Sequence, residues 1–176
     1  RWTYGRLFAC CSPTLLCVVS RDIYAYHRHQ ANHLRPETSM NIGIVGHEAA
    51  KFTPETELVA REVIRVLLAD PADVLVSGHC PLGGIDIWAE EESDALGRKK
   101  IIYPPLTHSW EDGYKPRNLQ IAETSDICYC LVVRELPPTY TGMRFTSCYH
   151  CHTTSHVKSG GCWTAKRCKR REWIYI

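Results

Sequence analysis

The chain has 176 residues, enough for one domain with a sizeable core, and its formal net charge is only +2. That small charge hides an asymmetry, because residues 40–142 carry −7 whereas residues 143–176 carry +6. The acidic middle of the chain disfavours nucleic acid, and no apolar run reaches the roughly 20 residues that span a bilayer. We therefore expect no membrane partner, and we expect nucleic acid only as a less favoured partner of the basic C-terminal part.

The ten cysteines do not indicate a disulfide framework, since secreted disulfide proteins are usually shorter than about 80 residues and lack a core of this size. Cys128 and Cys130 alternate within an apolar run, a pattern typical of buried, reduced thiols. Cys148 and Cys151 form a C-x-x-C pair, which indicates metal or redox chemistry in a reducing compartment. We expect a cytoplasmic protein.

The chain changes character at Met40. Before it, aromatic, basic and cysteine residues follow no period of 2 or 3.6 residues, whereas every later segment has a clear pattern. We expect residues 1–39 to be an N-terminal extension that is disordered or not native. Residues 40–176 are expected to form a single ligand-binding domain.

Short apolar runs predict the strands. Each run is bounded by glycine, proline or polar residues and is too short for a buried helix. The expected strands cover residues 41–46, 74–76, 101–103, 126–133 and 173–176.

The helix after the first strand has a well-marked start. Thr53 is a typical N-cap, and Pro54 suits the first helical position because its missing N–H would have no partner there. Val59, Val63 and Leu67 recur with the helical period, so we expect them to form the buried face.

Three further helices are expected. The second runs from Ile85 to Leu96 and ends at Gly97, and the third begins near Pro116. The last one opens at residues 159–161 and ends in the basic run 166–171.

This alternation of strands and helices predicts a parallel sheet that is covered on both faces. The fold class is therefore α/β, a Rossmann-like three-layer α/β/α sandwich with a mostly parallel sheet of about five strands. A segment rich in Cys and His, residues 134–158, is inserted before the last helix.

Four loops at the expected carboxyl ends of the strands combine glycine with polar residues. In open parallel sheets ligands bind at these ends, and glycine lets the main chain approach a phosphate closely. We therefore expect a phosphorylated, nucleotide-type ligand here. The candidate binding residues are Gly46, His47, Ser77, Gly78, Gly83, Gly84, Asp86, Arg117, Asn118, Ser159, Gly160, Gly161 and Thr164.

Two charged residues of this set allow different interpretations. Asp86 either stabilises the start of its helix or accepts a hydrogen bond from a ribose hydroxyl. Arg117 at a helix start would oppose the helix dipole unless an anion is bound. We expect Arg117 to bind phosphate, so that its removal weakens binding with little loss of stability.

The residues from Val76 to Glu90, together with Pro116-Arg117-Asn118 and Ser125-Asp126, resemble the YspA-like branch of the SLOG superfamily. That superfamily also includes the LOG phosphoribohydrolases and the DNA-processing protein Smf/DprA. The resemblance covers essentially residues 40–176. It implies a Rossmann-like fold that binds a nucleotide or a nucleotide-derived molecule, which in some relatives is a signal to be sensed.

The sequence differs from the LOG enzymes at one loop. Those enzymes carry a Pro-Gly-Gly-x-Gly-Thr-x-x-Glu loop whose glutamate supports catalysis, whereas residues 159–166 contain no carboxylate. We therefore expect binding rather than turnover. The alternatives are a hydrolase or transferase acting on an N-glycosidic or phosphate bond, with Glu48, His79 or Asp86 as acid or base, and a nucleic-acid binder using the basic C-terminus. Assembly as a homo-oligomer is left open.

The insertion and the loop after it hold a second set of chemically active residues. Thiolates and imidazoles are the ligands that tetrahedral zinc prefers, so we expect one zinc ion, which would fasten the insertion over the phosphate loop. The alternative is that the histidines face the ligand or solvent. The candidate metal ligands are Cys148, His150, Cys151, His152, His156 and Cys162.

Overall fold

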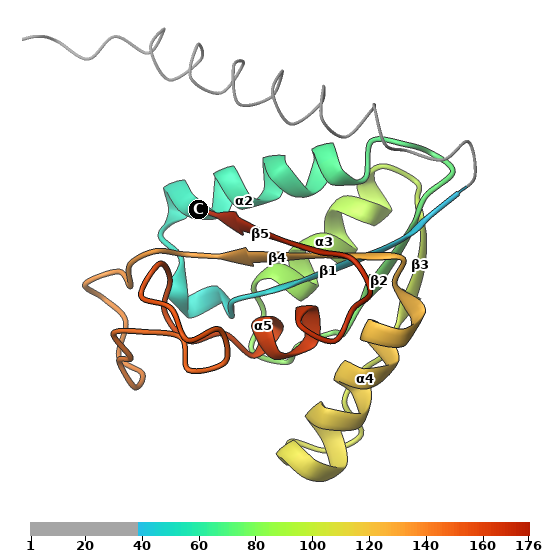
Figure 1. Ribbon diagram of the computed structural model, residues 1–176. Coiled ribbons are helices and arrows are strands. Elements are labelled where there is room, and N and C mark those ends of the chain that lie inside the picture. Colours follow the sequence, from blue (N-terminus) through green and yellow to red (C-terminus); the bar gives the residue numbers. More distant parts are fainter. Residues whose placement is uncertain (1–38) are drawn as a thin grey trace, which may run out of the picture. The chain divides into compact units, whose positions relative to one another are not determined.

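The computed structural model describes residues 39–176 (Figure 1). The expectation about residues 1–39 therefore concerns a segment that, apart from Ser39, lies outside the described residues. Five strands form one parallel sheet in the order β3-β2-β1-β4-β5. The sequence prediction of an α/β, Rossmann-like fold is confirmed. The strands are β1 (Asn41–Gly46), β2 (Val74–Ser77), β3 (Lys99–Ile102), β4 (Ile127–Val132) and β5 (Arg171–Tyr175).

Helices cover both faces of the sheet (Figure 1). Because successive side chains of a strand point to opposite faces, Ile44 and Val45 of β1 belong to two different buried clusters. Ile44 packs with Ile64 and its neighbours on one face, and Val45 packs with Ile121 on the other. The helices are α2 (Pro54–Leu67) and α3 (Ile85–Ala95) on the first face, and α4 (Lys115–Thr124) and α5 (Gly160–Ala165) on the second.

Helix α2 begins where the sequence predicts. The hydroxyl of Thr53 accepts a hydrogen bond from the Thr56 N–H at 3.2 Å, and the Thr56 hydroxyl accepts one from the Thr53 N–H at 2.8 Å. The predicted face is only partly correct. Val63 and Leu67 pack against the core, but Val59 is exposed, and Ala60 and Ile64 are the fully buried residues. The row that begins at Val59 and the row that begins at Ala60 both have helical spacing. Contact with the sheet determines which row is fully buried.

The third helix begins earlier than expected. The Ser109 hydroxyl caps a π-helical turn, η2 (Trp110–Tyr114), which runs directly into α4. Arg117 therefore lies about two turns inside a continuous helical segment. The helix-dipole argument for a phosphate on Arg117 no longer applies.

The last helix is also shorter than expected. It ends at Ala165, residues 166–170 form a turn, and Arg171 is the first residue of β5. Arg167 and Arg171 donate hydrogen bonds to main-chain carbonyls of this region, at Trp163 and Lys166. The prediction that the last helix includes the basic run is therefore wrong.

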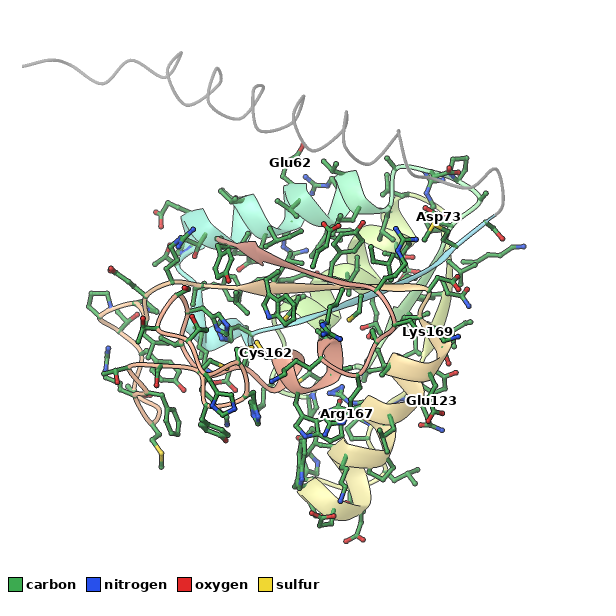
Figure 2. All side chains as sticks on the ribbon, in the orientation of Figure 1. Glu62, Asp73, Glu123, Cys162, Arg167 and Lys169 are labelled. Atoms are coloured by element: carbon green, nitrogen blue, oxygen red, sulfur yellow. The ribbon has the colours of Figure 1, made fainter. Side chains whose placement is uncertain are left out.

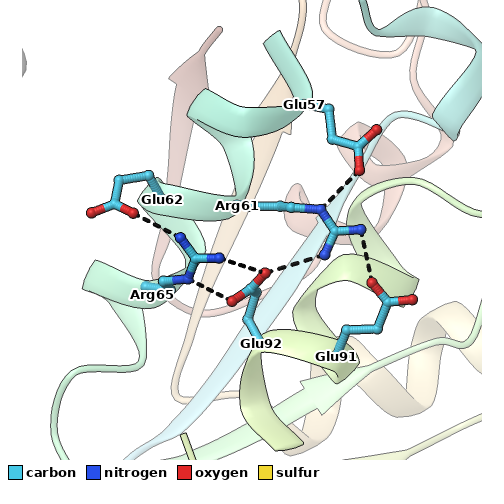
Figure 3. Close-up of polar contacts among 6 residues, drawn as sticks. All are labelled: Glu57, Arg61, Glu62, Arg65, Glu91 and Glu92. Atoms are coloured by element: carbon cyan, nitrogen blue, oxygen red, sulfur yellow. Dashed lines mark hydrogen bonds and ion pairs between the residues drawn. The ribbon is translucent and has the colours of Figure 1, made fainter. Parts of the chain in front are cut away.

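An ion-pair network joins α2 to α3 (Figure 3). The Glu92 side chain, only 7% exposed, accepts hydrogen bonds from Arg61 at 3.1 Å and from Arg65 at 2.6 Å. Arg61 also pairs with Glu57 and Glu91, and Arg65 pairs with Glu62. One buried carboxylate thus orders two guanidinium groups that are one helical turn apart.

Replacing Glu92 should therefore destabilise the domain. Glu92→Ala leaves both arginines without their shared acceptor, and we expect a loss of about 1–2 kcal/mol in the free energy of unfolding, measured by urea denaturation. The half-exposed Glu91, with a single arginine contact, is the matched control, and Glu91→Ala should cost less than about 0.5 kcal/mol. Equal losses for the two variants would contradict a central role for Glu92.

Candidate functional site

Three thiols and one imidazole form a compact cluster. The Sγ atoms of Cys148, Cys151 and Cys162 and a ring nitrogen of His156 all lie within 4.8 Å of one another. The Sγ atom of Cys162 is 3.7 Å from Nε2 of His156. A tetrahedral zinc ion, with Zn–S near 2.3 Å and Zn–N near 2.0 Å, places neighbouring ligand atoms about 3.5–3.8 Å apart. The cluster therefore has the composition and the size of a site that could hold a metal ion.

A tight hairpin turn presents the first two thiols. The N–H groups of Cys151 and His152 both donate to the carbonyl of Cys148, at 3.2 and 2.8 Å, and the Cys148 N–H donates to the carbonyl of Thr153. His152 closes the turn with a positive φ of 56°. The C-x-x-C spacing is thus used to fold the chain back so that both sulfur atoms reach the same cluster.

The third group, His156, comes from the segment that leads into α5, and the fourth, Cys162, comes from α5 itself. Nδ1 of His156 lies 2.7 Å from the carbonyl oxygen of Val157, so that this nitrogen carries the proton and donates it. The lone pair of Nε2 is left to face Cys162. Histidines that bind metals commonly have their other nitrogen fixed in this way.

Cys162, in the first turn of α5, also contacts a thiol of the sheet. Its Sγ lies 3.7 Å from that of Cys130 on β4. The hydrogen bond from Cys130 lowers the pKa of Cys162 to about 5 in spite of burial, whereas burial raises the pKa of Cys130. The lowered pKa favours the thiolate form of Cys162, which is the form that a metal binds.

The structure excludes two of the expected metal ligands from the cluster. His150 lies inside the hairpin turn and its ring packs on Tyr149, with the ring centres 4.3 Å apart. His152 serves the turn itself. The expectation that either would complete the site is corrected, because turn geometry leaves His156 and Cys162 as the partners of the C-x-x-C pair.

His47 has its hydrogen-bonding capacity filled by the protein. Nδ1 accepts a hydrogen bond from the Val133 N–H at 3.0 Å, while Nε2 donates to the carbonyls of Val157 and Lys158. Burial, helped by nearby Lys51, lowers the pKa of His47 to about 3, so the ring is neutral. His47 thus ties the segment beside His156 to the carboxyl ends of β1 and β4, a role that no sequence signal indicated.

The glycines of the first and last loops pack against each other. A Cβ atom on Gly161 would lie 2.7 Å from the main-chain nitrogen of Gly46. The Ser159 hydroxyl donates to the carbonyl of Gly46 at 3.2 Å and accepts from the Gly161 N–H at 3.1 Å. Gly84, with a φ of 85°, would collide through any Cβ with the main chain after His47. These three glycines allow the main chain of one loop to contact the main chain of another.

The remaining predicted residues are spread around this junction. Thr164 and Asn118 are buried, and Gly83 lies against Ala49. Nothing lies within 4 Å of the Cβ position of Gly160 in the described part of the chain. Glu48 accepts a hydrogen bond from the Tyr140 hydroxyl at 3.1 Å.

Asp86 and Arg117 form a buried ion pair beside the end of β2. NH1 of Arg117 donates to Asp86 Oδ2 at 3.0 Å and to the carbonyl of Gly78 at 2.8 Å, and both side chains are 9% exposed. Burial raises the pKa of Asp86, an effect that the guanidinium opposes. Nε of Arg117 is buried without a hydrogen-bond partner among the described residues. His79, the third candidate acid or base, follows the same strand and contacts Glu90 of α3.

The comparisons with known proteins do not assign a family, since no family model, no curated protein and no solved structure matches the chain. Within residues 39–176, no helix is both long and apolar enough to cross a membrane. The resemblance to the SLOG superfamily therefore depends on the sequence motifs alone.

The buried pair changes what we expect of Arg117→Ala. This variant leaves Asp86 buried without its counter-charge, and we expect a loss of about 3 kcal/mol near pH 7 rather than unchanged stability. The native-state pKa of Asp86 is already raised and rises further without Arg117, so the penalty is absent below the unfolded-state pKa of about 3.9 and grows as pH increases. Urea unfolding near pH 7 and near pH 4.5 measures this difference.

A double variant provides the control. Arg117→Ala combined with Asp86→Asn removes the unpaired charge, so it should be more stable near pH 7 than Arg117→Ala alone. An equal loss for Arg117→Ala at both pH values would contradict a buried, charged Asp86.

Proposed function

We propose that the protein is a zinc-containing, Rossmann-like domain that binds a nucleotide-type phosphorylated ligand beside the carboxyl ends of its strands. The observation that carries the zinc assignment is the cluster of Cys148, Cys151, His156 and Cys162. Three thiolates and one imidazole are a donor set of structural zinc sites. Four protein ligands leave no coordination position for water, so the ion would hold structure and would not activate a nucleophile.

Zinc at this site would fix the insertion to the rest of the domain. The hairpin turn at Cys148 and the start of α5 would share one ion, and His47 and Ser159 already fasten the intervening segment to β1. Ordering a loop costs about 1–2 kcal/mol per residue in backbone entropy, and metal binding offsets that cost. The ion would therefore hold the insertion in place against the start of α5.

Elemental analysis of protein purified without added metal should find one zinc per chain. Cys162→Ser should lose the ion and lower the melting temperature by several degrees, because the binding free energy of the metal is part of the folding free energy. His152→Asn is the matched control, since asparagine tolerates a positive φ and His152 lies outside the cluster. Protein that contains no zinc and has freely reactive Cys148, Cys151 and Cys162 thiols would refute the assignment.

A separate observation supports the ligand. Nε of Arg117 is buried without an acceptor at the side of the sheet where Rossmann-like folds bind ligands. The crevice between β1 and β4, where such folds usually bind, is taken up here by His47 and by the main chain of Gly161. We therefore assign the ligand to the end of β2, close to Arg117. The SLOG-like motifs favour a nucleotide or a nucleotide-derived molecule.

Calorimetric titration with nucleoside mono- and diphosphates and ADP-ribose tests this assignment. Wild type should bind at least one of them, and Arg117→Lys should weaken binding at least tenfold, because lysine keeps the charge but loses the planar fork. Lys169→Ala, on the turn before β5 (Figure 2), should bind as wild type does. Gly161→Val is not informative, since its side chain would displace Gly46.

The outcomes separate the alternatives. If no compound binds, or if Arg117→Lys binds equally well, the ligand assignment is wrong. If Lys169→Ala has the stronger effect, the basic C-terminal part binds the phosphate groups, and nucleic acid becomes the better candidate partner.

A further inference from the structure

His79 has a backbone conformation that needs an explanation. Its φ is 50°, and His152 is the only other non-glycine residue of the described chain with a positive φ. A positive φ is uncommon for a non-glycine residue, although histidine adopts it more readily than most, and such conformations cluster at functional sites. His152 closes a hairpin turn, whereas His79 lies in the loop between β2 and α3.

A buried carboxylate holds the imidazole of His79. Nδ1 lies 2.9 Å from Oε2 of Glu90, whose other oxygen lies 3.4 Å from the hydroxyl of Ser77. The Glu90 side chain is 11% exposed, whereas that of His79 is 55% exposed. In an ordinary surface pair both groups are in water. Here the anion is anchored inside the domain and the ring reaches the solvent.

We propose that His79 is a general base, oriented by Glu90, for the attack of water on a phosphoanhydride of the nucleotide-type ligand. This inference depends on the proposed function. By accepting the Nδ1 proton in a hydrogen bond, Glu90 fixes the tautomer in which Nε2 has a free lone pair. Nε2 has no partner among the described residues and is therefore available to a water molecule.

The step is balanced without another reactant. Nε2 takes one proton from water as the water oxygen forms a bond to phosphorus. The bond from phosphorus to the bridging oxygen breaks, and its electron pair leaves with the departing phosphate. The imidazolium then returns the proton to the solvent.

The neighbouring groups favour an anhydride over an N-glycosidic bond. A departing phosphate is a stable anion, whereas a departing base needs a proton from a second acid. The nearest carboxyl groups are already engaged, Asp86 by Arg117 and Glu90 by His79. Arg117 donates to the carbonyl of Gly78, the residue before His79, so its positive charge is close to where negative charge would develop on the phosphate.

Phosphorus NMR of the full chain with Mg²⁺ and a panel of nucleoside di- and triphosphates and ADP-ribose tests the activity. Wild type should cleave at least one anhydride, and in oxygen-18 water the label should enter the product phosphate. His79→Gly should lower kcat at least 100-fold with KM within threefold, and added imidazole should restore part of the rate. Glycine adopts a positive φ freely, so this variant should melt within a few degrees of wild type.

Two further variants separate catalysis from structure. His79→Asn also tolerates the backbone conformation and should be inactive, which covers the case in which the glycine variant fails to fold. Glu90→Gln should lower kcat about tenfold and leave KM unchanged, because the positioning residue does not touch the ligand. A purely structural Glu90 would instead change KM and stability together. His108→Gln, at an exposed loop histidine, should match wild type.

Binding of a methylene-bridged analogue distinguishes the two levels of the proposal. If wild type binds the analogue but cleaves no anhydride, the base assignment fails and the ligand assignment stands. If neither binding nor cleavage is found, both fail. Equal cleavage by wild type and His79→Gly would also overturn the role of His79.

Discussion

The neutral imidazole of His47 joins three parts of the chain that are far apart in sequence. One nitrogen accepts a hydrogen bond from the strand end at Val133, and the other donates to the carbonyls at residues 157 and 158. A neutral ring can do both only as one tautomer, and burial keeps it neutral by lowering its pKa to about 3. The thiol cluster lies immediately beyond this connection, so its histidine, His156, is next to the residues that these bonds hold in place.

The order of strands and helices along the chain follows from local sequence patterns, and so it could be predicted. Apolar runs of four to eight residues define the strands, and Thr53-Pro54 defines the start of α2. Local patterns do not show which of two neighbouring rows of residues on a helix is buried. For this reason Val59 was predicted to be buried, whereas the structure buries Ala60. Pro116 looked like a helix start, but the π-helical turn begun by Ser109 continues through it.

The candidate site was predictable in its residue types and not in its pairings. The C-x-x-C spacing indicated two members of the Cys/His cluster, but the sequence could not show which of three nearby histidines joins them. The ion pair of Asp86 and Arg117 joins residues 31 positions apart, which no local pattern shows. Glycine was read as making room for a ligand, whereas at Gly46, Gly84 and Gly161 it makes room for other main chain. A glycine that makes room for a ligand and a glycine that makes room for main chain cannot be distinguished in a single sequence.

The two outer strands of the sheet also bear on how copies of the chain meet. β3 begins with the exposed lysines Lys99 and Lys100, and β5 begins with the exposed pair Arg171 and Glu172. Strand edges with unpaired main-chain groups can recruit a further strand from another molecule, and charged side chains oppose this. If β3 of a second copy paired in register with this β3, the lysines of the two strands would lie next to each other and repel. The two edge strands thus carry charged side chains that oppose edge-to-edge aggregation.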